Sequence, residues 1–271
     1  MEDLVAIVTG GSRGIGAGIA MELAAAGAKV AVLARDAERG GRVIDAIAAA
    51  GGHGWFVAAD LTREADVARA VEAARDRFGA VHLLVSDAAL TPSRAGTAAG
   101  GGTAAGTVTD IPLDIWQRYF DVNVSGAFFA CRHAVPHMVD AGYGSIVVVN
   151  SIGSRHAMAG DVGYASSKAA LSGLTRAMAV DLAPTVRVNE ILCGFFPNPT
   201  DNPVHRALLT DPTTHRAVIE ANLVGRAGHP ADAGHACVFL LSPEAGFVTG
   251  QSLVVDGGAH TPIRLPHLPK A

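Results

Sequence analysis

Short apolar runs alternate with alanine-rich stretches of helical composition along almost the whole chain. The runs are LVAIVT, KVAVLA, GWFVAAD, VHLLVS, SIVVVN, VRVNEIL and SLVVD. They are apolar throughout, which is typical of strands in a parallel sheet that helices cover on both faces. Repeated strand–helix units with right-handed crossovers predict an α/β fold: a Rossmann-type, doubly wound parallel sheet of about seven strands with helices on both faces.

No linker or change of composition divides the 271 residues, so we expect residues 1–271 to form a single domain. Two segments interrupt the alternation. Residues 91–110 are rich in Gly, Ala and Thr, and residues 195–203 are punctuated by prolines. Both follow strand ends, where open α/β sheets bind ligands, so we interpret 91–110 as a loop insertion and 195–222 as a substrate loop. A disordered insertion is the alternative for the first segment.

Charge and cysteine content exclude several classes of protein. The formal net charge is −4, whereas a nucleic-acid-binding face needs a basic surplus. No apolar run approaches the roughly 18 residues that a membrane span requires. The acidic start of the chain shows no cleavable signal, and Cys131, Cys193 and Cys237 form no disulfide framework. We therefore expect a cytoplasmic protein with neither nucleic-acid nor membrane partners.

A glycine-rich turn, VTGGSRGIG, joins the first strand-like run to the first helix-like stretch. Gly10 permits a tight turn, Gly14 lets the backbone approach a diphosphate, and Gly16 lets the helix pack closely on the sheet. The helix N-terminus then offers free N–H groups and the positive end of its dipole. The turn predicts a nucleotide site, and a glycine-rich turn without a ligand is the alternative.

Together with GYASSKAAL downstream, this turn resembles the short-chain dehydrogenase/reductase family. Thr9 to Gly16 match the motif TGxxxGxG, and Tyr164 to Lys168 match YxxxK. The segment DVNVSG matches the one that carries the family's catalytic asparagine, at Asn123. Ser151 lies thirteen residues before Tyr164, where the family places its catalytic serine. The resemblance covers almost the whole chain, including the ending VTGQSLVVDGG.

The pair Tyr164 and Lys168 can exchange a proton with a substrate. On a helix the two residues share a face, and a neighbouring ammonium is expected to lower the tyrosine pKa from its usual value near 10. Tyr164 would then act as general acid or base. The resemblance implies that Lys168 also holds the nicotinamide ribose, that Ser151 donates to the substrate oxygen, and that Asn123 orders a water. Ser154 and Ser167 are competing serines.

The resemblance also implies a set of cofactor-binding residues. They are Gly10, Ser12, Arg13, Gly14, Ile15, Gly16, Arg35, Asp60, Leu61, Asp87, Ala88, Ala89, Tyr164, Lys168, Gly194, Phe196 and Asn198. The chain departs from the family where N-N-A-G becomes Ser86-Asp87-Ala88-Ala89, and where His82 replaces a frequent aspartate. These departures are expected to weaken cofactor binding.

The end of the second strand-like run indicates which cofactor is used. NAD-specific sites place Asp or Glu there to bind the ribose 2′-hydroxyl, but this chain has Ala34 followed by Arg35. Guanidinium groups pair with a phosphate, so Arg13 and Arg35 are expected to converge on the 2′-phosphate of NADP. NAD, bound through Asp36, is the alternative.

The motifs together predict an NADPH-dependent reductase of a ketone, β-keto or cyclic carbonyl compound, with Tyr164 as general acid. The alternatives are an NAD-dependent alcohol dehydrogenase and a non-redox or regulatory nucleotide-binding protein. The set of Asn123, Ser151, Tyr164 and Lys168 argues against the last. His133 and His137 have metal-ligand spacing but no third ligand, so no metal is expected. The expected partner is a small-molecule carbonyl or alcohol substrate. Because members of the family commonly form oligomers, the resemblance also implies a homo-oligomer, either a tetramer or a dimer.

Overall fold

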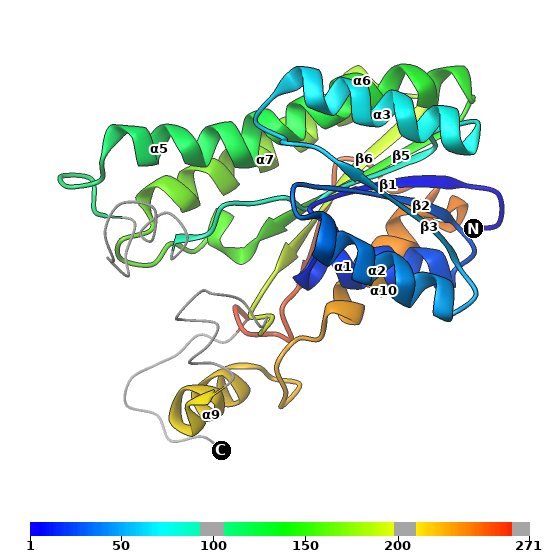
Figure 1. The fold of residues 1–271 in the computed structure, drawn as a ribbon. Helices are drawn as coiled ribbons and strands as arrows, with labels where there is room; N and C mark the ends of the chain where they lie inside the picture. The colour runs from blue at the N-terminus through cyan, green and yellow to red at the C-terminus, as the bar shows by residue number, and fades with distance from the viewer. Residues whose placement is uncertain (93–105, 198–209, 262–271) are drawn as a thin grey trace.

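The computed structural model describes residues 1–92, 106–197 and 210–261. One parallel sheet of seven strands has the order β3-β2-β1-β4-β5-β6-β7 (Figure 1). The strands are β1 (Val5–Thr9), β2 (Lys29–Ala34), β3 (His53–Ala58), β4 (Leu83–Ser86), β5 (Gly144–Ser151), β6 (Val186–Cys193) and β7 (Ser252–Val255). The predicted fold class is confirmed.

Helices cover both faces of the sheet (Figure 1). The helices of the described residues are α1 (Gly14–Ala25), α2 (Ala37–Ala49), α3 (Glu64–Phe78), α5 (Leu113–Phe120), α6 (Gly126–Asp140), α7 (Val162–Asp181), α9 (Pro212–Ala221) and α10 (Pro230–Leu241). One apolar core lies under α1, α2 and α10, and another under α3, α6 and α7. Within the described ranges, none of these helices is both long and apolar enough to cross a bilayer.

The strand order places β1, and with it the glycine-rich turn that follows β1, near the centre of the sheet. β1 lies between β2 and β4, so successive strands run outward from it in both directions. Chain segments that leave the carboxyl ends of β1 and β4 therefore go to opposite faces and open a crevice between them. Thr9 and Ser86 end the two strands and pair in register there.

Residues 121–139 do not form one continuous α-helix. Asp121–Ser125 form a π-helical turn between α5 and α6. This wider turn rotates the side chains of its residues relative to a regular helix, a feature that is common at functional sites.

Two short helices, α5 and α9, were not predicted from the sequence. The start of α9 has residues typical of a helix N-terminus. Asp211 is the N-cap, whose side chain accepts the N–H of Thr214, and Pro212 occupies the first turn. The predicted substrate loop over 195–222 is therefore helical near its end.

His82 stabilises the fold at the opposite edge of the sheet from the crevice. Its Nδ1 atom accepts the N–H of Val5 at 3.0 Å, which ties the amino ends of β1 and β4 together. Burial lowers the pKa of His82, so the imidazole stays neutral and can accept this hydrogen bond. This departure from the family pattern lies just before β4, at the amino edge of the sheet.

Candidate functional site

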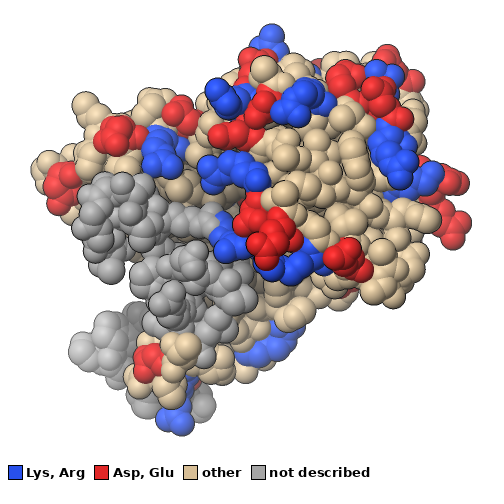
Figure 2. Space-filling view, in the orientation of Figure 1, with Lys and Arg blue, Asp and Glu red and all other residues tan. Residues whose placement is uncertain are grey.

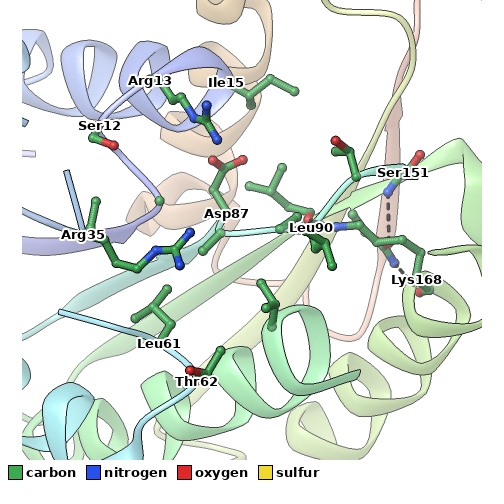
Figure 3. A pocket seen from close by; sticks show the side chains of 18 of the residues that line it. Ser12, Arg13, Ile15, Arg35, Leu61, Thr62, Asp87, Leu90, Ser151 and Lys168 are labelled. Carbon is green, nitrogen blue, oxygen red and sulfur yellow. Dashed lines mark hydrogen bonds between the residues drawn. The ribbon is translucent and has the colours of Figure 1, made fainter. Parts of the chain in front are cut away.

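A cavity of about 990 Å³ lies at the carboxyl edge of the sheet. Most of the predicted cofactor and catalytic residues line it: Gly10, Ser12, Arg13, Ile15, Arg35, Asp60, Leu61, Asp87, Ala88, Ala89, Ser151, Tyr164, Lys168, Gly194 and Phe196. Figure 3 shows Arg13, Arg35 and Asp87 toward one end and Ser151 with Lys168 toward the other. Gly14, Gly16 and Asn123 do not form its wall, and Asn198 lies outside the described residues.

The turn after β1 is shaped for close approach of a ligand. Gly10 has φ +73°, and a Cβ atom there would lie 2.7 Å from the backbone of Ala88. Helix α1 begins at Gly14 without a side-chain cap and without an acidic residue in its first turn. N–H groups and the positive end of the helix dipole are therefore presented to the cavity, which fits the diphosphate of a dinucleotide.

Arginine side chains surround the end of the cavity near β2. Arg13 and Arg35 point into it (Figure 3), and Arg39 lines it as well. Asp36 lines this end of the cavity too, where its carboxylate caps α2 by accepting the Arg39 N–H at 3.0 Å and pairs with the Arg39 side chain at 3.2 Å. The same end of the cavity contains Asp60, whose Oδ1 accepts from the N–H and hydroxyl of Thr62.

Tyr164 and Lys168 come from α7, and Ser151 ends β5. The Lys168 ammonium is buried, donates to the Val149 carbonyl at 3.1 Å and lies 5.9 Å from the centre of the Tyr164 ring. The Ser151 hydroxyl accepts the Gly153 N–H at 3.0 Å and hydrogen-bonds to the Tyr164 hydroxyl. Three polar groups with proton-donating capacity thus converge on one end of the cavity.

The expected lowering of the Tyr164 pKa is wrong for this state of the protein. Burial raises the pKa of Tyr164 to about 12, and the hydrogen bond from Ser151 opposes this only in part. Burial also lowers the pKa of Lys168, while the Asp87 carboxylate favours its charged form. Tyr164 is therefore held as a neutral phenol that has a proton to give.

Asn123 connects two elements and does not face the cavity. The π-helical turn directs its side chain to the segment after β4, where it accepts the Leu90 N–H at 2.7 Å and donates to the Leu90 carbonyl at 3.2 Å. It also donates to the Ser167 hydroxyl at 2.9 Å, and that hydroxyl donates to the Tyr164 carbonyl. Asn123 thus fixes α7 relative to the segment that follows β4.

The competing serines have other surroundings. Ser167 is fully buried, and its hydroxyl accepts a hydrogen bond from Asn123. The two residues lie far apart in the sequence, so no local pattern indicates this contact. The Ser154 hydroxyl is buried without a hydrogen-bond partner among the residues that the structure describes. Of the three serines, Ser151 is the one that lines the cavity and whose hydroxyl interacts with the Tyr164 hydroxyl, whereas Ser167 bonds to the Tyr164 carbonyl.

The two histidines with metal-ligand spacing face acidic residues of α3. Both histidines belong to α6. The Nε2 atom of His133 lies 3.2 Å from Oε1 of Glu64, and the Nε2 atom of His137 lies 2.9 Å from Oε1 of Glu72. Within residues 1–92, 106–197 and 210–261, no group of three or more His, Cys, Asp or Glu side chains is placed to hold a metal ion.

Several cavity residues were not predicted from the sequence. They include Arg39, Thr62, Leu90, Arg118, Asp121, Val149 and Asn150. Arg39 and Thr62 lie within four residues of predicted positions and could have been found by extending those motifs. Arg118 and Asn150 become neighbours of the site only through the folding of the chain. On the face drawn in Figure 2, basic and acidic side chains are interspersed.

Asp87 places a carboxyl group at the nucleotide turn. It accepts the Gly16 N–H at the start of α1, and a Cβ atom on Gly16 would overlap its carboxylate. Burial raises the pKa of Asp87, and the charge of Lys168 opposes this rise. Tyr164 and Cys193 also lie within electrostatic range. A raised pKa means that ionisation at higher pH costs the folded state free energy and adds a negative charge beside the diphosphate site.

We predict that Asp87→Asn with Ala89→Gly tightens nucleotide binding, because it removes this negative charge and the extra methyl group. The wild-type dissociation constant should rise as the pH increases through the Asp87 ionisation, and the double variant should bind roughly tenfold more tightly above it. Fluorescence titration with NADPH and with NADH at several pH values measures both effects. Ala89→Gly alone is the control and should retain the wild-type pH dependence. Weaker binding by the double variant would show that Asp87 makes an attractive contact with the nucleotide.

Comparison with known proteins places these features in a wider group. A family sequence model described as enoyl-(acyl carrier protein) reductase matches residues 10–260. The 3-alpha-(or 20-beta)-hydroxysteroid dehydrogenase of Mycobacterium bovis is 34% identical, over 94% of this chain and 88% of that protein. The cyclohexanol dehydrogenase of an Acinetobacter species is 31% identical, over 93% of each chain.

A solved structure shows the same likeness in three dimensions. It is a 7 alpha-hydroxysteroid dehydrogenase in complex with NADH and 7-oxo glycochenodeoxycholic acid. The TM-score is 0.83 at 32% identity, and the alignment covers 95% of this chain and 94% of that one.

Proposed function

Because the chain belongs to the short-chain dehydrogenase/reductase family of NAD(P)-dependent oxidoreductases, which act on hydroxyl and carbonyl groups, we propose that it is an NADPH-dependent carbonyl reductase. Its substrate is a ketone, β-keto or cyclic carbonyl compound, and Tyr164 is the general acid. The observation that carries this proposal is the meeting of Ser151, Tyr164 and Lys168 at one end of a cavity whose other end contains Arg13, Arg35 and Arg39.

Each residue of the site has a separate role in the proposed reduction. The bound nicotinamide would supply the hydride. Ser151 donates a hydrogen bond to the substrate carbonyl oxygen and orients it. Tyr164 gives its hydroxyl proton to the same oxygen as negative charge develops there, and its raised pKa keeps that proton in place until then. Lys168 stabilises the resulting phenolate electrostatically and binds the ribose. Asn123 acts through the position of α7.

The cofactor proposal rests on charge at the β2 end of the cavity. A carboxylate there would repel a 2′-phosphate. Ala34 offers none, and the charge of Asp36, which also lines this end, is offset by its ion pair with Arg39. The guanidinium groups of Arg13 and Arg35 point into the same space. The remaining predicted nucleotide contacts, including Asn198, belong to this proposal on family grounds. Use of NAD for alcohol oxidation is the competing function, since the structural relative described above binds NADH.

The substrate class follows from the relatives. The hydroxysteroid and cyclohexanol dehydrogenases carry cyclic alcohols in their names, so a cyclic ketone and its secondary alcohol are the first compounds to test. We propose that residues 1–271 work as one unit and that the loop insertion 91–110 and the substrate loop 195–222 serve substrate binding; residues 93–105 and 198–209 of these segments lie outside the described residues. Phe196 lines both this cavity and a smaller one of about 290 Å³, which also includes Phe195.

We further propose that the protein is a cytoplasmic homo-oligomer, a tetramer or a dimer. Its cysteines are buried free thiols, as a reducing compartment favours. Large apolar side chains are exposed on two surfaces, where a second copy of the chain could cover them. They are Phe128, Val139 and Val180 on α6 and α7, and Phe239, Phe247 and Leu253 on or near α10 and β7.

We predict that Tyr164→Phe abolishes nearly all turnover while cofactor binding is retained, because only the transferable proton is removed. Ser151→Ala should lower kcat about a hundredfold, as the loss of one donor to a developing oxyanion does. Steady-state kinetics with a ketone panel and nucleotide titration measure the two effects separately. Ser154→Ala is the matched control and should be mild. Near wild-type kcat in Tyr164→Phe would reject the mechanism.

We predict that wild type prefers NADPH to NADH and that Arg13→Ala with Arg35→Ala removes most of this preference. A charge-assisted hydrogen bond contributes about 1.5–3 kcal/mol, so each arginine should account for roughly tenfold or more in affinity. The measurement is the ratio of kcat/KM for the two cofactors. Arg42→Ala, at an exposed position of α2, is the control. A wild-type preference for NADH would reject the cofactor assignment.

A further inference from the structure

A buried polar cluster lies behind the catalytic residues, on the sheet side of α7. Its members are Asn150 of β5, Ser172 of α7, Glu190 of β6 and Ser252 of β7. Asn150 is 2% exposed and Glu190 is 1% exposed. Polar side chains from four elements are thus hydrogen-bonded to one another at this point.

Asn150 contacts the backbone of two of the proposed catalytic residues at once. Its Oδ1 accepts the N–H of Ser151 at 2.9 Å, and its Nδ2 donates to the carbonyl of Lys168 at 3.0 Å. The first bond fixes the strand end that carries the serine hydroxyl. The second fixes the turn of α7 that carries the ammonium. One side chain therefore sets the distance between the two groups.

Glu190 anchors the Asn150 amide. Its Oε2 accepts from Asn150 Nδ2 at 2.7 Å and from the Ser172 hydroxyl at 3.0 Å, and its Oε1 accepts from the Ser252 hydroxyl at 2.5 Å. All three partners are donors, which is the arrangement that an ionised carboxylate needs. In the described part of the chain no lysine, arginine or histidine forms an ion pair with it.

Burial of a carboxylate without an ion pair raises the free energy of the folded state, so other interactions must offset this cost. The three hydrogen bonds offset part of it. The charge also acts on Lys168, because Glu190 is among the groups that oppose the lowering of the Lys168 pKa by burial, after Asp87 and Cys193. The cluster therefore connects to the active site by geometry and by charge.

We propose that Asn150, held by Glu190, is a positioning residue that sets the placement of Ser151 relative to Lys168. This inference rests on the proposed function, in which Ser151 and Lys168 serve one reaction. Asn150 lines the cavity and its amide also donates to the Ser172 hydroxyl at 3.1 Å. Its bonds to Ser151 and Lys168 go to their backbone, not to the Ser151 hydroxyl or the Lys168 ammonium, so we assign its effect to the placement of that backbone. Its loss should lower kcat more than it raises the KM of the nucleotide, because the alignment of Ser151 is needed mainly in the transition state.

Asn189, the neighbour of Glu190 on β6, provides a matched control. It is fully buried and makes two comparable bonds, from Nδ2 to the Val248 carbonyl at 2.9 Å and to Oδ1 from the Gln251 N–H at 3.0 Å. These partners precede and follow the bend into β7 and lie away from the cavity wall. Asn189→Ala should cost a similar amount of stability without disturbing the catalytic backbone.

Asn150→Ala is expected to lower kcat at least tenfold and to change the nucleotide KM less than threefold. Asn189→Ala, with a comparable loss of Tm, should keep kcat within about twofold, both assayed well below their Tm values. Equal losses of kcat in the two variants would overturn the proposal, because kcat would then follow stability alone.

Glu190→Gln tests the anchor by a conservative change. A glutamine oxygen in the place of Oε2 can still accept from Asn150 and Ser172, while its amide donates to a reoriented Ser252 hydroxyl. We expect the kcat of Glu190→Gln to stay within about threefold of the wild-type value. The kcat of Glu190→Ala should decrease as much as that of Asn150→Ala. The variant with both alanines should lose no more than Asn150→Ala alone, since the two residues act as a unit. Equal damage by glutamine and alanine, or additive losses, would overturn the anchoring role.

Amide hydrogen exchange separates this inference from the proposed function. The Ser151 N–H should exchange faster in Asn150→Ala than in wild type or Asn189→Ala, whether or not a substrate is known. Unchanged exchange would overturn the positioning role. Absence of wild-type turnover with all carbonyl and alcohol compounds would instead reject the proposed function, while the exchange result would still decide whether Asn150 holds Ser151.

Discussion

The common direction of the seven strands is the constraint on which the site depends. Because every strand points the same way, the segments that leave β1, β2, β4, β5 and β6 emerge at one edge of the sheet. The glycine turn, Arg35, Asp87, Ser151 and Gly194 are far apart in the sequence and meet there. Helix α7 completes the cavity by packing against β5 and β6, which carries Tyr164 and Lys168 to the same edge. The chemistry thus comes from strand ends and one helix, on a scaffold of aliphatic packing.

Burial shapes the electrostatics of this edge as much as charge does. It raises the pKa values of Asp87 and Tyr164 and lowers that of Lys168, so each group is pushed toward its neutral form. The attraction between Asp87 and Lys168 works in the other direction. Asp87 stands where the family motif that the sequence resembles has asparagine, and its carboxylate favours the charged form of Lys168. Glu190 adds a second negative charge behind the same lysine.

Local spacing made much of the site predictable. The glycine turn and the Tyr164–Lys168 pair each lie within a few residues on one element, so the sequence determines their relative positions. The resemblance to the family implied Ser151, which lies thirteen residues before Tyr164 in the sequence. The contacts of Asn150 with Glu190 and of Asn123 with Ser167 join segments that only the fold brings together, and no local pattern marks them. The pKa of Tyr164 was predicted in the wrong direction, because a helix spacing shows the neighbouring ammonium but not the loss of solvent. Helix α5 and the role of His82 were missed for the same reason, since both depend on tertiary packing.

The proposed mechanism requires direct transfer of hydrogen from the cofactor to the carbonyl carbon. The measurement is reduction of a cyclic ketone by the wild-type protein with NADPH that carries deuterium at the transferable position of the nicotinamide. The expected product carries one deuterium at the carbinol carbon, while its hydroxyl hydrogen comes from solvent through Tyr164. A product whose carbinol carbon contains no deuterium from the cofactor would rule out this hydride transfer.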